Sequence, residues 1–225
     1  MLDSIALQCK VTFMEPNWAA EHLQVIRTLM ERSALYRRAL APIMTFCGAV
    51  GIAGGIAGVA LRIDSPRPFI VFWAGAGAVS LIGSFLLVRR QALKEAEPFW
   101  SPPTRRVTQA LLPPLITGWL FGIVAVLRVA GDEPFARVIS MLWLPLGWVV
   151  LYGCALCAAG FFTTRGLKLF GWAFILGGCA FFAAGIPDGL SRLYTAHGIM
   201  GFFFGVLHLA YGVYLYFTEK GKNAA

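Results

Sequence analysis

The chain has 225 residues, of which 58% are hydrophobic and only 13% are charged. An ordinary soluble domain carries roughly 25% charged residues, so this composition excludes a water-soluble globule. The charged residues lie in a few clusters, and the apolar stretches between them have the length of roughly 20 residues that a helix needs to cross a bilayer. The sequence therefore predicts a polytopic membrane protein with no second soluble domain.

Six apolar stretches predict an all-α fold, a polytopic membrane helix bundle with six transmembrane helices. The predicted spans are 41–61, 68–88, 107–127, 138–161, 167–186 and 195–217. They define a transmembrane domain over 41–217, with a cytoplasmic amphipathic segment over 1–40 before it and a cytoplasmic tail over 218–225 after it. We expect a kink at Pro145 in the fourth span, because proline removes a backbone donor and crowds the preceding turn.

Lysine and arginine are unevenly shared between the segments that flank these spans. Fourteen of the 19 lie before the first span, in the second and fourth loops, or after the last span, and five lie in the alternate loops. Because positively charged loops stay in the cytoplasm, this bias predicts an inner-membrane protein with both termini cytoplasmic. The net charge of +8 therefore sits at membrane boundaries, where anionic lipid headgroups are the nearest partner, and it does not indicate nucleic-acid binding.

Residues 17–38 are the one substantial stretch expected outside the bilayer. Pro16 and Asn17 form a helix-start signal before a run of apolar and polar residues at helical spacing. The residues on the less polar face are Trp18, His22, Val25, Leu29 and Tyr36. Such an amphipathic helix could rest on the headgroups or serve as a docking surface for a cytoplasmic protein partner.

Glycines organise the first span. Gly51 with Gly55, and Gly54 with Gly58, form two overlapping pairs of small residues four positions apart. This spacing lets two helix backbones approach closely in lipid. The pairs predict helix packing, either within the protein's own bundle or across a homo-oligomer, and the sequence does not separate the two.

The last span carries one stripe of aromatic and histidine residues at alternating steps of three and four. Its members are Tyr194, His197, Gly201, Phe204, His208, Tyr211 and Leu215. Eleven residues separate the histidines, which is three helical turns, so their side chains are expected to point the same way about 16 Å apart. An imidazole in lipid has no hydrogen-bond partner, so His208 is expected to face the bundle interior.

Four interpretations of this stripe stay open. Its histidines could be buried packing residues, hydrogen-bonded across helices. They could ligate haem, although no second ligand is visible on another span. They could serve a proton-coupled small-solute transporter, although no acidic residue lies within a span core. They could also line a lipid, quinone or pigment pocket, whose candidate ligand-binding residues are His197, His208, Tyr211, Tyr194 and Phe204.

No residues point to catalysis, and no group of residues is assigned as a metal site. An intramembrane hydrolase is disfavoured, because no aspartate or glutamate accompanies the histidines and no serine–histidine pair stands out. Asp188 and Arg192 lie four residues apart just before the last span, so a helical turn would let them pair on the outer face. We therefore do not expect an enzyme.

Two short motifs mark the ends of the chain. Glu31-Arg32-Ser33 with Tyr36-Arg37 precede the first span, and the last span contains His197-Gly198, Phe204-Gly205, His208 and Tyr211-Gly212. In these motifs the chain resembles a group of uncharacterised bacterial six-span integral membrane proteins. The group has no established activity, so it implies no site residues. Some of its members occur beside small winged-helix regulators, which would suit a regulatory, sensory or scaffolding role with a cytoplasmic partner.

Overall fold

Six helices are long and apolar enough to cross a membrane. The structure is a computed structural model that describes residues 39–94, 99–128, 139–184 and 192–223. Within these ranges the candidate spans are Ala39–Ala60, Pro66–Lys94, Thr104–Arg128, Met141–Gly160, Arg165–Ala184 and Tyr194–Thr218. Each overlaps one predicted span, and the described residues form no strand, so the predicted all-α six-helix fold is confirmed. The amphipathic helix expected over 17–38 lies outside the described residues.

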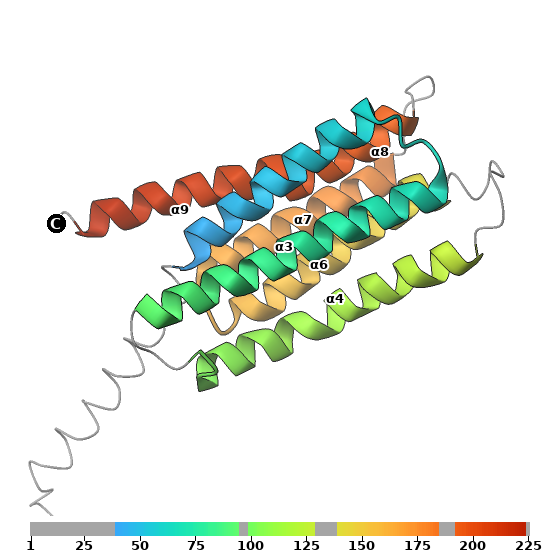
Figure 1. Ribbon diagram of the computed structural model, residues 1–225. Helices are drawn as coiled ribbons and strands as arrows, with labels where there is room; N and C mark the ends of the chain where they lie inside the picture. The colour runs from blue at the N-terminus through green and yellow to red at the C-terminus, as the bar shows by residue number, and fades with distance from the viewer. Residues whose placement is uncertain (1–38, 95–98, 129–138, 185–191, 224–225) are drawn as a thin grey trace, which may run out of the picture.

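The helices pack side by side in one bundle (Figure 1). After the first span, Ala39–Ala60, the elements are α3 (Pro66–Lys94), α4 (Pro102–Arg128), η2 (Ile139–Trp143), α6 (Leu144–Gly160), α7 (Arg165–Ala184), α8 (Arg192–Met200), η3 (Gly201–Leu207) and α9 (His208–Asn223). The last span consists of α8, η3 and most of α9, and it runs beside the first span (Figure 1). Helix α6 packs against both α4 and α7, while α4 lies at the edge of the bundle.

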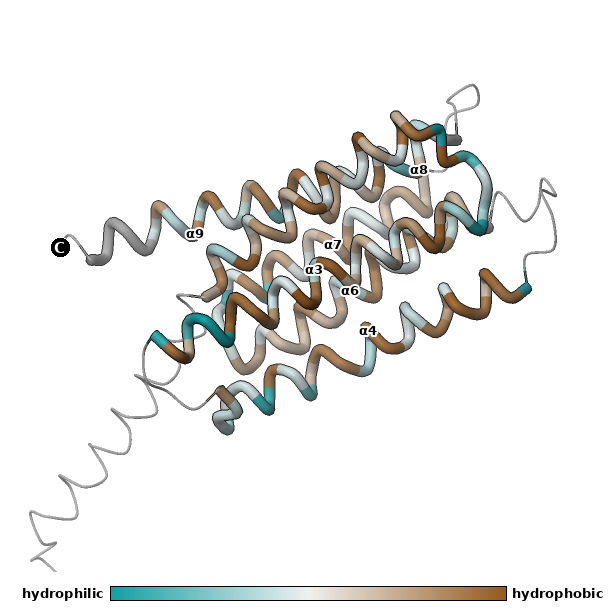
Figure 2. The backbone as a smooth tube through the Cα atoms, in the orientation of Figure 1, coloured by the Kyte–Doolittle hydropathy of each residue, from teal (hydrophilic) through white to brown (hydrophobic). Residues whose placement is uncertain are grey.

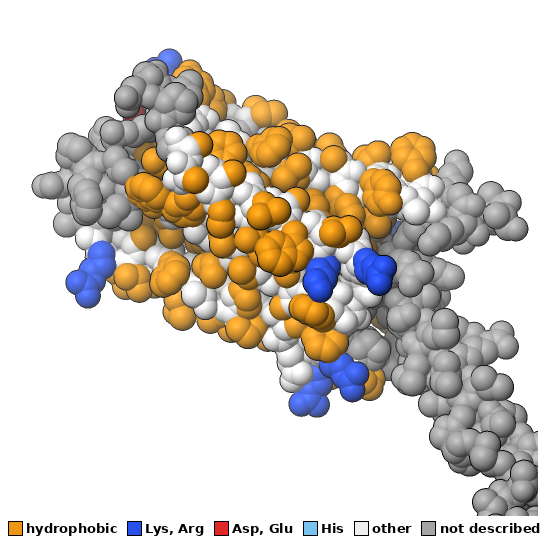
Figure 3. Space-filling model, turned by 180° about the vertical axis from the view of Figure 1, so that it is seen from behind, with side chains coloured by type: hydrophobic (Ala, Val, Ile, Leu, Met, Phe, Trp, Pro, Cys, Tyr) orange, Lys and Arg blue, Asp and Glu red, His pale blue; other side chains and the backbone are white. Residues whose placement is uncertain are grey.

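The distribution of side chains matches a lipid environment. Apolar residues dominate the middle of the helices and polar residues gather near their ends (Figure 2). On the face shown in Figure 3, hydrophobic side chains cover the middle, and lysine and arginine lie toward the ends. The described buried polar or charged side chains are Ser101, Thr104, His197 and His208. Many large apolar side chains are exposed instead, as expected where lipid tails and not water surround the bundle.

The first and last spans meet along a seam of glycines. A Cβ on Gly51 would overlap the backbone of Phe204, and one on Gly205 would lie 2.7 Å from the backbone nitrogen of Ile52. A Cβ on Gly55 would lie 3.2 Å from the Cα of Gly201. The two backbones can therefore approach this closely only because side chains are missing from both.

Gly54 and Gly58 complete the two glycine pairs of the first span. Gly54 faces the indole of Trp73 on α3, and Gly58 faces the ring of His197 on α8. With Gly51 and Gly55, all four glycines of the predicted pairs contact neighbours within the chain.

Prolines in α4 and α6 bear on the shape of these two helices. Pro113 and Pro114 lie in the interior of α4, because this helix begins at Pro102, earlier than the predicted third span. Pro145 lies in the first turn of α6, directly after the π-helical turn η2. The sequence predicts a kink at Pro145. The irregularity of the helix at this position is the π turn directly before the proline.

The first span ends in a Schellman motif. The N–H of Arg62 donates to the carbonyl oxygen of Val59 at 3.0 Å, and the N–H of Ile63 donates to that of Gly58 at 3.0 Å. Arg62 has a φ of 52°, in the left-handed region that usually requires glycine at this position. The motif directs the carbonyl oxygen of Ile63 toward the bundle, where it lies 3.0 Å from Nε2 of His197.

We expect Arg62→Gly to stabilise the protein by about 0.5–1 kcal/mol, because glycine adopts a left-handed backbone without the steric cost that a Cβ imposes. The readout is the midpoint of thermal unfolding of the detergent-solubilised protein. Arg62→Val is the matched control, since it removes the same charge but adds a β-branched side chain. Arg62→Val should lower the midpoint of unfolding. Equal midpoints for the two variants would contradict the conclusion that the left-handed backbone at position 62 favours glycine.

Candidate functional site

His197 joins three segments at one end of the bundle. The imidazole is 1% exposed. Its Nδ1 lies 3.1 Å from the indole nitrogen of Trp73 on α3, and its Nε2 lies 3.0 Å from the carbonyl oxygen of Ile63. Phe69 packs edge-on against the ring, with 5.0 Å between ring centroids. A Cβ on Gly58 would overlap the ring, so this glycine leaves the space that the imidazole occupies.

The partners of His197 determine which ring nitrogen carries the proton. An indole N–H only donates and a carbonyl oxygen only accepts. Nδ1 must therefore accept from Trp73, and Nε2 must carry the hydrogen that it donates to Ile63. His197 is thus a neutral imidazole with both ring nitrogens in hydrogen bonds, which satisfies a buried polar group.

His208 forms a second polar cluster with α6. The ring is 1% exposed, and its Nε2 lies 2.8 Å from the hydroxyl oxygen of Tyr152. Its Nδ1 lies 3.0 Å from the carbonyl oxygen of Phe203, five residues earlier in the same span. Phe170 and Phe174 of α7 pack edge-on against the ring, with centroids 5.2 and 5.3 Å away.

The tautomer of His208 follows from the same reasoning and is the opposite one. Because the Phe203 carbonyl can only accept, Nδ1 carries the hydrogen, and Nε2 accepts from the Tyr152 hydroxyl. The two histidines are therefore both neutral, with the hydrogen on Nε2 in His197 and on Nδ1 in His208. Each connects the last span to different helices.

The stripe predicted on the last span is divided between these two clusters. A regular helix would point both histidines the same way, but η3 is a π-helix, in which hydrogen bonds join residues five apart. The wider turn of the π-helix changes the angular register between the two rings. His197 consequently faces the first span and α3, whereas His208 faces α6 and α7.

The other predicted members of the stripe take different positions. Phe204 stacks against His208, with centroids 6.1 Å apart and an interplanar angle of 18°. Tyr211 stacks on Phe170 at 4.5 Å, and its buried hydroxyl oxygen has no hydrogen-bond partner among the described residues. Tyr194 is 62% exposed and joins neither cluster.

The two clusters do not fit a haem iron or another metal ion. Ligation needs a free nitrogen lone pair, and the lone pairs of His197 Nδ1 and His208 Nε2 already accept hydrogen bonds. A metal at His208 would have to displace the Tyr152 hydroxyl. Among residues 39–94, 99–128, 139–184 and 192–223, no three of the side chains His, Cys, Asp and Glu come together as a ligand set. The predicted pairing of Asp188 with Arg192 lies outside the described side chains.

Sequence reasoning missed the partners of both histidines. Trp73 and Tyr152 each carry one hydrogen-bonding group inside an otherwise apolar span, which is the signal that could have drawn attention to them. The carbonyls of Ile63 and Phe203 leave no trace in the sequence, because they depend on a helix end and on a π turn.

The fold and these clusters define the class of the protein: a six-helix membrane bundle whose interior holds two hydrogen-bonded histidines. In comparisons with family models, with curated proteins and with solved structures, nothing matches the chain. The family resemblance given above therefore stays a prediction, and the case for a function depends on the geometry.

Proposed function

We propose that this protein is a non-catalytic regulatory or scaffolding protein of the inner membrane, which anchors a cytoplasmic partner. The proposal rests on the hydrogen bonding of the two buried histidines. Both ring nitrogens of each are used to join helices, so the residues best suited to ligand or proton chemistry serve packing instead. A bundle whose histidines join helices in this way fits a membrane anchor better than it fits a haem protein or a transporter.

The distribution of basic residues supports cytoplasmic termini. The end of α3, the start of α4 and the start of α7 lie at one end of the bundle (Figure 1). These turns carry Arg89, Arg90, Lys94, Arg105, Arg106, Arg165 and Lys168. The opposite end has Arg62, Arg67 and Arg128 at the described helix ends, and Arg192 begins α8. The positive-inside rule assigns the more basic end to the cytoplasm, together with both termini.

The working surface in this proposal is the predicted amphipathic helix before the first span. We expect the full-length chain, crosslinked in its native membrane, to retain a specific cytoplasmic protein. Trp18→Glu with Leu29→Glu should abolish that crosslink, because both changes place charge on the apolar face. Glu31→Gln changes the polar face of the same helix and should leave the crosslink intact.

Two results would contradict this function. One is a chain that crosslinks only to lipid. The other is a set of crosslinked proteins that stays the same in the Trp18→Glu, Leu29→Glu variant. Absorption by a bound pigment or haem in the purified protein would favour the cofactor-binding alternative instead.

A further inference from the structure

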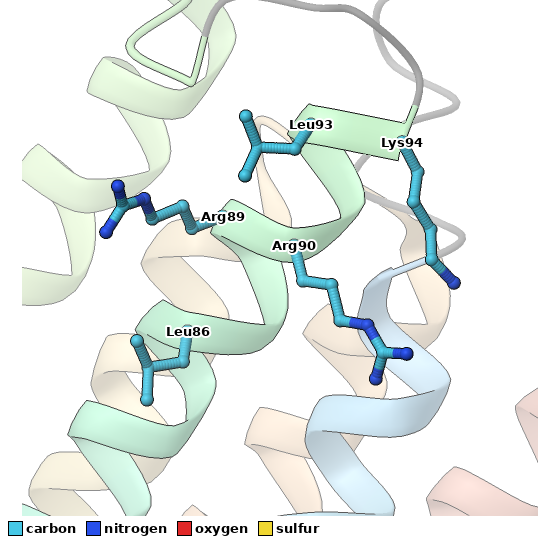
Figure 4. A pocket seen from close by; sticks show the side chains of 5 residues that line it. All are labelled: Leu86, Arg89, Arg90, Leu93 and Lys94. Atoms are coloured by element: carbon cyan, nitrogen blue, oxygen red, sulfur yellow. The ribbon is translucent and has the colours of Figure 1, made fainter.

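A cationic hollow lies on the last two turns of α3. It has a volume of about 480 Å³ and is lined by Leu86, Arg89, Arg90, Leu93 and Lys94 (Figure 4). The hollow is shallow and open, so it suits a ligand that stays partly outside the protein. All five side chains are exposed, so the surface is accessible from outside the bundle.

The lining combines positive charge with an apolar surface. Arg89 extends to one side of the helix, and Arg90 and Lys94 extend to the other (Figure 4). The two leucines are 54% and 74% exposed, and none of the described side chains that line the hollow is acidic. Guanidinium groups bind phosphate oxygens through paired hydrogen bonds, so the charge and donor chemistry match a phosphate with an apolar attachment.

Aromatic side chains indicate the depth of this hollow in the membrane. Phe85, one turn from Arg89 on α3, packs edge-on against Phe99 with centroids 5.1 Å apart. Phe99 stacks on Trp100, which is 60% exposed. Exposed aromatic residues of this kind gather where hydrocarbon meets headgroups. The hollow therefore lies at the level of the lipid phosphates, and a phosphate presented there belongs to a lipid more readily than to a soluble protein.

We propose that this hollow is a binding site for the headgroup of an anionic phospholipid. Arg90 and Lys94, which extend to the same side of the helix, contact the headgroup phosphate, Arg89 flanks the apolar strip from the other side, and an acyl chain runs along Leu86 toward the middle of the membrane. Such a site is more specific than the general attraction of basic residues to an anionic membrane surface, because three cationic side chains flank one apolar strip at the end of a single helix.

The test compares lipid binding to the full-length protein by native mass spectrometry. The probes are phosphatidylglycerol and phosphatidylcholine, added to delipidated protein. We expect the wild-type chain to bind phosphatidylglycerol in preference to phosphatidylcholine. Arg89→Gln with Arg90→Gln should weaken phosphatidylglycerol binding about tenfold or more and leave phosphatidylcholine binding unchanged, since each basic residue near an anionic lipid contributes measurably to its binding.

The matched control is Arg105→Gln with Arg106→Gln. It removes two exposed arginines from the start of α4, at the same end of the bundle but outside the lining of the hollow. This variant should keep most of the wild-type affinity. An equal loss in both variants, or no loss in either, would overturn the site in favour of diffuse surface attraction. Lys94→Gln gives a second measure, because it should produce a smaller loss in the same direction. Binding of inorganic phosphate by a chain that shows no preference for phosphatidylglycerol over phosphatidylcholine would show a phosphate site that does not recognise lipid, and would overturn the proposal.

Discussion

Replacing Gly51 by alanine is expected to destabilise the bundle by about 1–3 kcal/mol, because the added methyl group has no space. A Cβ at this position would overlap the carbonyl group of Phe204 on the last span. Backbone atoms cannot rotate away as a flexible side chain can, so the first and last spans would have to separate. The measurement is reversible unfolding in detergent or in bilayers, compared with the wild-type chain.

Gly75→Ala is the control for this experiment. Gly75 also lies in the middle of a membrane helix, α3, but no described atom beyond the neighbouring part of that helix lies within 4 Å of the position that its Cβ would occupy. Alanine is the better helix former, so this variant should be neutral or more stable by about 0.5–1 kcal/mol. A comparable loss of stability at Gly51 and Gly75 would show that glycine content, and not close approach of the two spans, explains the effect.

Replacing His208 by leucine is expected to cost about 2–4 kcal/mol. The change removes both hydrogen bonds of the ring and leaves the Tyr152 hydroxyl in an apolar site without its partner. It also disturbs the packing of Phe170 and Phe174 around the ring. Tyr152→Phe alone should cost less, about 1–2 kcal/mol, since it removes only one hydroxyl group.

The double variant separates the hydrogen bond from the packing. Once His208 is leucine, Tyr152→Phe removes an unpaired polar group and should restore part of the lost stability. The two changes should therefore be non-additive, with a coupling free energy of about 1 kcal/mol. Strict additivity would mean that the two side chains act independently, and it would also weaken the argument that His208 is unavailable to other ligands.

The spans could be predicted from sequence because lipid imposes one requirement on all of them. A backbone in hydrocarbon must satisfy its own hydrogen bonds, so a long apolar stretch has to form a helix. Each predicted span consequently overlaps an observed one. The ends differ by several residues, as for α3, which continues through the charged residues to Lys94, because a helix does not stop where the apolar run stops.

The histidine clusters could be predicted only in part. The burial of His208 follows from its chemistry in lipid, but its partner does not, because Tyr152 lies 56 residues away in the chain. Trp73 lies 124 residues from His197. A uniform helix would carry a single stripe, and η3 changes that register inside an apolar sequence that contains no proline.

The glycine seam has a consequence for how the membrane domain is assembled. The first span to be inserted finds its closest neighbour only when the sixth is made, so one face of it must wait in the bilayer while four intervening helices are synthesised. During that interval its bare backbone groove is lined by lipid tails, which cannot match it. Insertion of the last span thus covers this face, and a product that stops before it would leave the groove of the first span exposed to lipid.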